Sequence, residues 1–208
     1  MEKINLLEYE NEYKKQGYKY IGGTDEAGRG PLYGPVVAAC VILPDDFKLE
    51  GLNDSKKLTE KKREEYFKYL TQNVIYGVGI VDDKTIDEIN IYEASRLAMK
   101  KAINEVREKT KLDIILSDAM PIDLDIPVIP IIKGDAKSLT IAAASVIAKV
   151  TRDHMLYEID EKHPEYGFKN HKGYPTKKHL EAINEHGLID GYRLTYGPIK
   201  KYKEEGKC

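Results

Sequence analysis

The sequence predicts an α/β fold, with a mixed five-stranded sheet flanked by helices and a C-terminal helical extension. Two observations lead to this prediction. Five short apolar runs end in glycine, proline or acidic residues, and between them lie stretches in which apolar residues recur at helical spacing. The run VVAACVIL is apolar throughout, which is typical of a strand that is covered on both faces.

The elements follow from these patterns in order. Thr59 is a suitable N-cap for the second helix, and Gly187 follows the last one. Only about nine residues separate the fourth and fifth strands, which is short for a parallel crossover and leaves their relative direction open. After the last helix we expect a polar tail. The expected elements are helix 5–16, strands 18–25 and 36–43, helix 60–72, strand 74–82, helix 85–109, strands 112–118 and 127–132, helix 138–162, a loop over 163–175 and helix 176–186.

Length and composition limit the functional classes. A chain of 208 residues fits a single domain over 1–208, with roughly 163–208 as the extension. The net charge of −2 does not by itself indicate a nucleic-acid partner, but a total can hide basic patches. The two cysteines have no metal-like spacing, and we expect no disulfide. The charged N-terminus and the absence of a long apolar run favour a cytoplasmic protein without a membrane segment, and we expect a monomer.

Four carboxylates stand at strand ends or in the turns that follow: Asp25, Glu26, Asp118 and Asp135. Neighbours in a regular strand point to opposite faces, so we expect the strand to break at AGRG and let the first two converge. Oxygen ligands without cysteine suit Mg²⁺ or Mn²⁺. The alternative for any one of them is a turn or cap role, which we expect for Asp82, Asp83, Asp113 and Asp123.

A polar stripe runs along the otherwise apolar helix 138–162. Ser138, Ser145, Lys149 and Arg152 are spaced by seven, four and three residues, which places them on one face. Because Asp135 lies just before this helix, the stripe suggests a phosphate-bearing substrate. An ordinary solvated face is the alternative interpretation.

The segment FKNHKGYPTKKH, residues 168–179, interleaves basic residues with Phe168 and Tyr174. Such a composition can bind a sugar-phosphate backbone while a ring packs on a sugar or base, although solvated loops can have the same composition. Together with the helix, it predicts a local basic track of Lys56, Lys149, Arg152, Lys172, Lys177 and Lys178.

Five segments together resemble the type 2 ribonucleases H, and ribonuclease HII in particular: DEAGRGPLYGPVV, LNDSKKL, LSDAM, IIKGDAKSLTIAAASVIAKVTRD and HKGYPTKKH. They occur in the family's order and cover most of residues 20–180. The resemblance implies a ribonuclease H-like fold and an endonuclease that cuts the RNA strand of RNA–DNA hybrids. It also implies cutting of DNA duplexes at embedded ribonucleotides, with 5′-phosphate and 3′-hydroxyl ends and two bound Mg²⁺ or Mn²⁺ ions.

The resemblance also implies roles for individual residues. The catalytic, metal-binding carboxylates fall on Asp25, Glu26, Asp118 and Asp135. The family's glycine-arginine-glycine element falls on 28–30 and its junction-sensing tyrosine on Tyr174. With Ser145 from the helical stripe, the candidate substrate-binding residues are Gly28, Arg29, Gly30, Lys56, Ser145, Lys149, Arg152 and Tyr174.

Two positions depart from the family's pattern. Tyr33 stands where the family usually has a smaller residue, and Tyr192 stands where bacterial members more often have histidine. Both departures bear on substrate grip and not on the metal ligands. The chain lacks the long N-terminal extension of the type 3 enzymes, which favours type 2. The rival hypotheses are another nuclease or strand-transferase with an acidic cluster, which would also cut all-DNA duplexes, and a hybrid-binding module without turnover.

Overall fold

The computed structural model describes residues 5–49, 51–52 and 58–206, and its sheet has the order β3-β2-β1-β4-β5. β2 pairs antiparallel with β1 and β3, and β4 pairs parallel with β1 and β5, so the sheet is mixed as expected. The strands are β1 (Ile21–Ala27), β2 (Val36–Ile42), β3 (Ile75–Val81), β4 (Ile114–Asp118) and β5 (Val128–Ile131).

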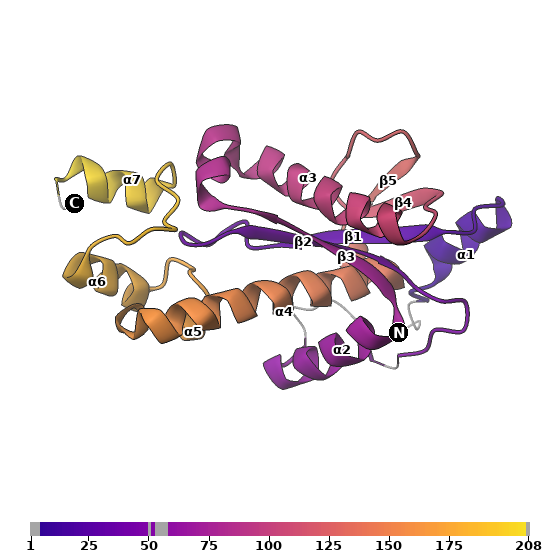
Figure 1. Cartoon of the computed structure of the whole chain (residues 1–208), viewed down its shortest axis with the longest axis horizontal. Coiled ribbons are helices and arrows are strands. Elements are labelled where there is room, and N and C mark those ends of the chain that lie inside the picture. Colours follow the sequence, from indigo (N-terminus) through magenta and orange to yellow (C-terminus); the bar gives the residue numbers. More distant parts are fainter. Residues whose placement is uncertain (1–4, 50, 53–57, 207–208) are drawn as a thin grey trace.

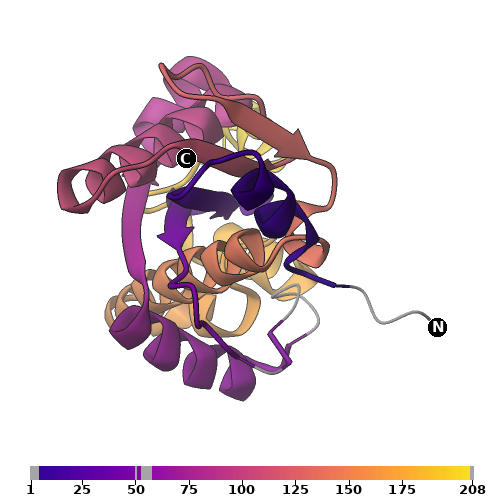
Figure 2. The same cartoon turned by 90° about the vertical axis from the view of Figure 1, so that its right-hand side faces the viewer.

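Helices cover both faces of the sheet, with α3 on one face and α4 and α2 on the other (Figures 1 and 2). Each face has its own apolar core, and β2 is buried at every residue, as its apolar sequence predicted. The helices are α1 (Glu8–Lys15), α2 (Glu60–Asn73), α3 (Asp83–Lys109), α4 (Leu139–Lys162), α5 (Phe168–His171), α6 (Lys177–His186) and α7 (Gly197–Glu204), with short 3-10 turns at Gly134–Ala136 and Pro164–Tyr166.

Most expected elements are present within a few residues of their expected ends, and Thr59 caps α2 by accepting from the Lys62 amide. Three features were not predicted. The polar C-terminal tail contains α7, and the loop expected over 163–175 contains the short helix α5. The predicted helix 85–109 is kinked at Asn90, whose φ of 68° is not helical and whose side chain caps the second part.

The direction of β5, which the sequence left open, is parallel to β4. Residues 119–127 make this connection without a helix. The buried side chains of Met120 and Ile122 hold this connection against the core beneath α3. A connection between parallel strands usually has a helix in this role.

Helix α4 approaches β1 very closely because Gly23 has no side chain. A Cβ at that position would lie 2.4 Å from the Thr140 carbonyl carbon and 2.5 Å from the Ile141 nitrogen. At the start of α4, Ser138 caps the helix and donates to Glu10 of α1, whose carboxylate also accepts from the Thr140 amide. Ser138 is therefore part of this cap. It does not belong to a substrate-binding surface, as the predicted polar stripe had suggested.

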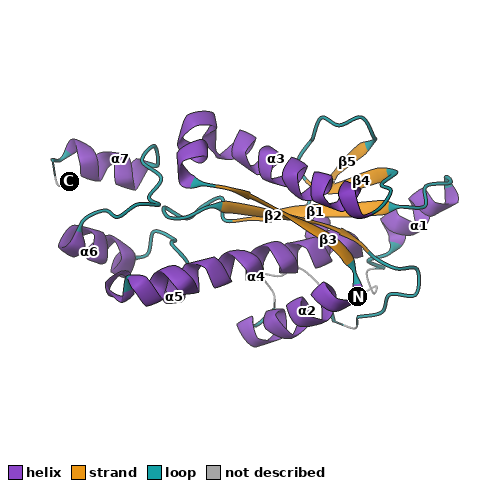
Figure 3. Ribbon diagram, in the orientation of Figure 1, coloured by secondary structure: helices purple, strands orange, loops and turns teal. Residues whose placement is uncertain are grey.

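The C-terminal helices α5, α6 and α7 lie beyond the end of the sheet (Figure 3). They share an apolar cluster with the β1–β2 connection, in which Tyr33 packs 4.3 Å from Phe168 and 5.0 Å from Tyr192, measured between ring centroids. Tyr33 and Tyr192, the two departures from the family's pattern, thus contact each other in this cluster. The division into one domain with an extension from residue 163 stays a prediction.

Burial of His179 in this cluster predicts an acid-sensitive fold. Its Nδ1 lies 2.9 Å from the Tyr174 carbonyl, its Nε2 lies 2.9 Å from the Tyr192 hydroxyl, and burial lowers its pKa from 6.5 to about 4. A lowered pKa gives stability that is present above pH 6.5 and is lost as the pH falls from there toward 4. We expect a loss on the order of 2–3 kcal/mol over this interval.

The measurement is the free energy of unfolding in urea between pH 7 and pH 4. The His179→Asn variant should be less stable at pH 7 and have a flatter pH dependence than the wild type. His163→Gln, which removes a partly exposed histidine, is the matched control and should keep the wild-type slope. An unchanged slope in His179→Asn would contradict the prediction.

Candidate active site

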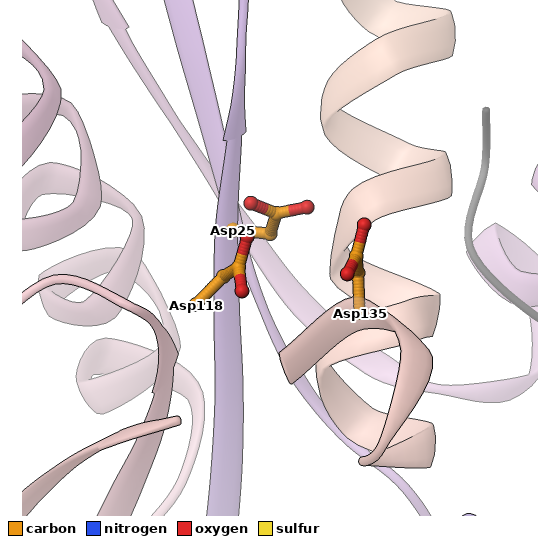
Figure 4. Close-up of side chains that lie close together, drawn as sticks. All are labelled: Asp25, Asp118 and Asp135. Atoms are coloured by element: carbon orange, nitrogen blue, oxygen red, sulfur yellow. The ribbon is translucent and has the colours of Figure 1, made fainter. Parts of the chain in front are cut away.

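Three carboxylates converge where β1, β4 and the turn before α4 meet. One oxygen each from Asp25, Asp118 and Asp135 lies within 4.8 Å of the other two. Figure 4 shows Asp25 on the strand, Asp118 beside it, and Asp135 across from them at the turn before the helix. Residues far apart in sequence thus form one acidic cluster, because β1 and β4 are neighbours in the sheet and α4 begins against β1.

The cluster is held by local hydrogen bonds. Asp118 accepts from the Gly134 amide at 2.7 Å, which ties the end of β4 to the turn that carries Asp135. Asp25 accepts from the Glu26 amide at 2.8 Å and from the Ser145 side chain.

Glu26 differs from the sequence-based expectation. The strand ends at Ala27, within AGRG as expected, but it stays regular through Asp25 and Glu26, with Asp25 opposite Ala39 and Glu26 opposite Ala38, so no break separates the two residues. The Glu26 carboxylate is instead placed beside the cluster, with Oε1 3.3 Å from Arg29 Nη1. Asp118 is near enough to act on the pKa of both residues of β1.

The electrostatics of the cluster are those of crowded buried anions. Burial raises the pKa of Asp25 well above its ordinary value, and the charges of Glu26 and Asp118 raise it further. Burial also raises the pKa of Glu26, although Arg29 lowers it in part. Glu26 Oε2 is buried and accepts no hydrogen bond within the described part of the chain. Carboxylates that repel one another, with one buried oxygen that has no donor among the described residues, are an arrangement that a hard divalent cation would stabilise.

A cavity of about 240 Å³ opens next to the cluster. Most of the candidate residues from the sequence line it: Asp25, Glu26, Gly28, Arg29, Gly30, Ser145, Lys149, Arg152 and Tyr174, together with Ala27. The sequence therefore predicted which segments come together here. Lys56 lies outside the described residues.

Gly28 is required by the shape of this cavity. Its φ of 98° is in the left-handed region, and a Cβ there would lie 2.2 Å from Arg152 Nε. Tyr174 lines the same cavity next to Gly30 and is 44% exposed, with its ring 3.2 Å from where a Cβ of Gly30 would be. A tyrosine exposed to this extent is not a core residue.

The predicted basic track is smaller than expected. Lys149 lines the cavity and pairs with Asp153 at 2.5 Å, and burial lowers its pKa. Arg152 and Lys172 are buried and point inward, so they are not free to bind phosphates as expected. Arg152 donates to three backbone carbonyls. The Lys172 ammonium contacts the Tyr157 hydroxyl and the Lys169 carbonyl.

On the outer surface, Lys177 and Lys178 are exposed, and Lys177 lies 3.7 Å from Glu181. Asp82 has the expected cap role, since it accepts from the Thr85 amide at the start of α3, whereas Asp113 accepts from the Lys19 and Tyr20 amides and joins the segments that lead into β4 and β1. Sequence reasoning missed Arg193, which donates to the carbonyls of the β1–β2 connection. Arg193 lies between Tyr192 and Leu194 in the expected tail, and a single arginine there carries no sequence signal for such a role.

Comparison with known proteins identifies the family. The family model described as Ribonuclease HII matches residues 22–196. The chain belongs to the ribonuclease HII family. The Ribonuclease HII of Bacillus cereus (strain G9842) is 53% identical over 203 residues, which is 96% of this chain and 78% of that protein. Membership makes the chain a ribonuclease H, a hydrolase that acts on RNA–DNA hybrids.

Solved structures of ribonucleases H have the same fold. The ribonuclease H2 of Pyrococcus horikoshii OT3 is 29% identical, with a TM-score of 0.72 over 90% of this chain and 98% of that one. The RNase HII in a complex with PCNA from Archaeoglobus fulgidus is 27% identical, with a TM-score of 0.72 over 86% and 95%. Bst-RNase HIII in complex with Mn²⁺ is 17% identical, with a TM-score of 0.73 over 90% and 70%, which shows the shared fold alone. The ribonuclease H-like fold predicted from the sequence is thereby confirmed.

The crowded carboxylates predict opposite effects of one substitution with and without metal. Asp118→Asn removes one repelling charge, so we expect the metal-free melting temperature to rise by about 2–4 °C. Asp25, Glu26 and Asp135 remain, but the ligand set loses an anion. Mg²⁺ or Mn²⁺ should therefore raise the melting temperature of the wild type and raise that of Asp118→Asn much less.

The measurement is thermal unfolding with EDTA and in a titration of each ion. Asp113→Asn is the matched control, because Asp113 accepts from the Lys19 and Tyr20 amides away from the cluster. It should lower the metal-free melting temperature and leave the metal-induced rise intact. A full metal-induced rise in Asp118→Asn would contradict a role of this carboxylate in metal binding.

Proposed function

We propose that this chain is a divalent-metal-dependent endonuclease that cuts the RNA strand of RNA–DNA hybrids and cuts DNA duplexes at embedded ribonucleotides. The products are 5′-phosphate and 3′-hydroxyl ends. The observation that carries the proposal is the convergence of Asp25, Asp118 and Asp135 beside a cavity lined by a glycine turn, a lysine and an exposed tyrosine. The cytoplasmic location and the monomeric state stay predictions.

The metal ligands in this proposal are Asp25, Glu26, Asp118 and Asp135. Two Mg²⁺ or Mn²⁺ ions bound there would supply activation of the attacking water and stabilisation of the departing 3′-oxygen. The acidic side chains set the position of the scissile phosphate relative to the cavity. Bare carboxylates would repel a phosphate, so a binding module without turnover leaves this arrangement unexplained.

Substrate recognition is assigned to the walls of the cavity. The backbone at 28–30 can approach a ribose closely, and a 2′-hydroxyl offers both a donor and an acceptor to amide and carbonyl groups. Ser145 positions Asp25, and Lys149 contributes positive charge toward a phosphate. Arg29 lies on Glu26 and fixes that carboxylate at the edge of the cavity.

The decisive test is cleavage of three matched duplexes: an RNA–DNA hybrid, a DNA duplex with one ribonucleotide, and the same duplex entirely of DNA. We expect cleavage of the first two with Mg²⁺ or Mn²⁺, and no cleavage of the third or with EDTA. Asp25→Asn, Glu26→Gln, Asp118→Asn and Asp135→Asn should each lower kcat by roughly 100-fold or more while the fold survives, because each removes an anionic ligand. Cleavage of all-DNA duplexes would support another acidic-cluster nuclease, and full activity of Asp118→Asn would reject the metal mechanism.

Tyr174 is expected to contact the substrate by packing, not by proton transfer. Tyr174→Phe should therefore keep most activity on a single-ribonucleotide duplex, and Tyr174→Ala should lose roughly 10-fold or more, consistent with the energy of ring stacking. The loss should be larger on single-ribonucleotide duplexes than on long hybrids, because the former offer one junction only.

Melting temperatures of both variants give the control, since the Tyr174 ring is exposed and its removal should change them little. If Tyr174→Ala melts several degrees lower and loses activity only in proportion to unfolding, its role is structural.

A further inference from the structure

The β1–β2 connection, residues 28–35, is held by two buried arginines from distant parts of the chain. Arg193 is 0% exposed and Arg152 is 1% exposed. Every carbonyl of the connection except that of Gly30 accepts a hydrogen bond from one of these two residues.

Arg193 supplies most of these bonds. Its Nη2 donates to the Gly28 carbonyl at 2.6 Å and its Nε to the Gly34 carbonyl at 2.9 Å. Its Nη1 lies 3.0 Å from the Arg29 carbonyl and 2.9 Å from the Pro31 carbonyl, and its backbone amide donates to Leu32. One guanidinium therefore binds backbone carbonyls along the connection, from Gly28 to Gly34. A planar group with five donors is the side chain that can do this.

The bonding pattern leaves a specific part of the backbone available. Within the described part of the chain, no hydrogen bond engages the Gly30 carbonyl or the amides of residues 28–30. These groups belong to the residues that line the cavity beside Asp25 and Glu26. The other carbonyls of the connection are bound by the two buried arginines, and the unpaired donors and acceptor are those of the turn that borders the acidic cluster.

We propose that Arg193 is a positioning residue for substrate recognition, which fixes residues 28–30 in the conformation that presents their free backbone groups to a ribose. This rests on the proposed function for the ribose contact. Tyr196 supports the same backbone, because its hydroxyl donates to the Arg29 carbonyl at 2.7 Å and lies 2.9 Å from Arg193 Nη1. Arg193 and Tyr196 thus act on the cavity through the backbone of the β1–β2 connection.

The test uses Arg193→Lys, which keeps the charge but offers one ammonium in place of the planar fork. Tyr196→Phe is the milder second variant, since it removes one hydroxyl and leaves the guanidinium. Met99→Ala is the matched control for lost stability, because Met99 is a fully buried residue of α3 and belongs to the core on that face of the sheet.

The first readout is amide hydrogen exchange in the folded protein and does not depend on activity. The Leu32 and Gly34 amides donate to the Gly173 and Gly191 carbonyls at 2.8 Å each, so they report whether the connection stays in place. In Arg193→Lys they should exchange faster, with β2 amides still protected. In Met99→Ala they should keep wild-type protection relative to global unfolding. Wild-type exchange of both amides in Arg193→Lys would overturn the proposal.

The second readout is cleavage of a single-ribonucleotide duplex well below the melting temperature of every variant. Arg193→Lys should lower kcat/KM by about 100-fold, as expected for a misplaced recognition group. Tyr196→Phe should lower it by about five-fold. The Mn²⁺-induced rise in melting temperature should be unchanged in both, because the carboxylates are intact. Loss of activity only in proportion to the unfolded fraction, as in Met99→Ala, would overturn the positioning role.

The two readouts separate the two proposals. If the wild type cleaves none of the ribonucleotide substrates, the proposed function fails, and hydrogen exchange still decides whether Arg193 fixes the turn. If the wild type cleaves and Arg193→Lys has wild-type kcat/KM, the positioning role fails and the proposed function stands.

Discussion

The site depends on the close contact between α4 and β1 at Gly23. Any side chain at that position would meet the Thr140 and Ile141 backbone, so the helix could not keep its distance from the strand. Asp25 lies two residues further along the strand, and Asp135 lies in the turn that leads into the helix. The distance that allows their oxygens to share one site is therefore set by a missing side chain. The carboxylates supply the chemistry, but glycine sets their separation.

Charges that are costly to bury stand on two sides of one cavity. Burial raises the pKa of Asp25 and Glu26, and on the other side burial lowers the pKa of Arg152 to about 10. Within the described residues Glu26 Oε2 is buried without a donor, and the Arg152 guanidinium is matched by carbonyl dipoles and not by a carboxylate. Divalent cations would offset the repulsion among the carboxylates. The acidic side of the cavity is thus complementary to the ions that the proposed reaction needs.

The sequence predicted most of the fold and the acidic cluster because both leave local signals. Apolar runs and caps such as Thr59 mark elements, and acidic residues at strand ends mark the shared edge of a sheet. The direction of the Arg152 and Arg193 side chains leaves no such signal, because most of their partners are carbonyls of distant segments and every residue has a carbonyl. The strand ends within AGRG as expected, but the break does not separate Asp25 from Glu26, because pairing with β2 holds the strand extended through Ala27, and this pairing is a tertiary property.

The C-terminal extension is best understood as part of the site. Tyr33 and Tyr192 form an isolated bridge and pack edge to face, so the two departures from the family's pattern amount to one contact. That contact lies between the β1–β2 connection and the segment that carries Arg193. His179 lies beside the Tyr192 hydroxyl and also hydrogen-bonds to the Tyr174 carbonyl. The glycine turn and Tyr174, which both line the cavity, are therefore supported by one buried aromatic cluster. Disruption of this cluster should change substrate recognition before it changes the acidic cluster, whose supports are β1, β4 and α4.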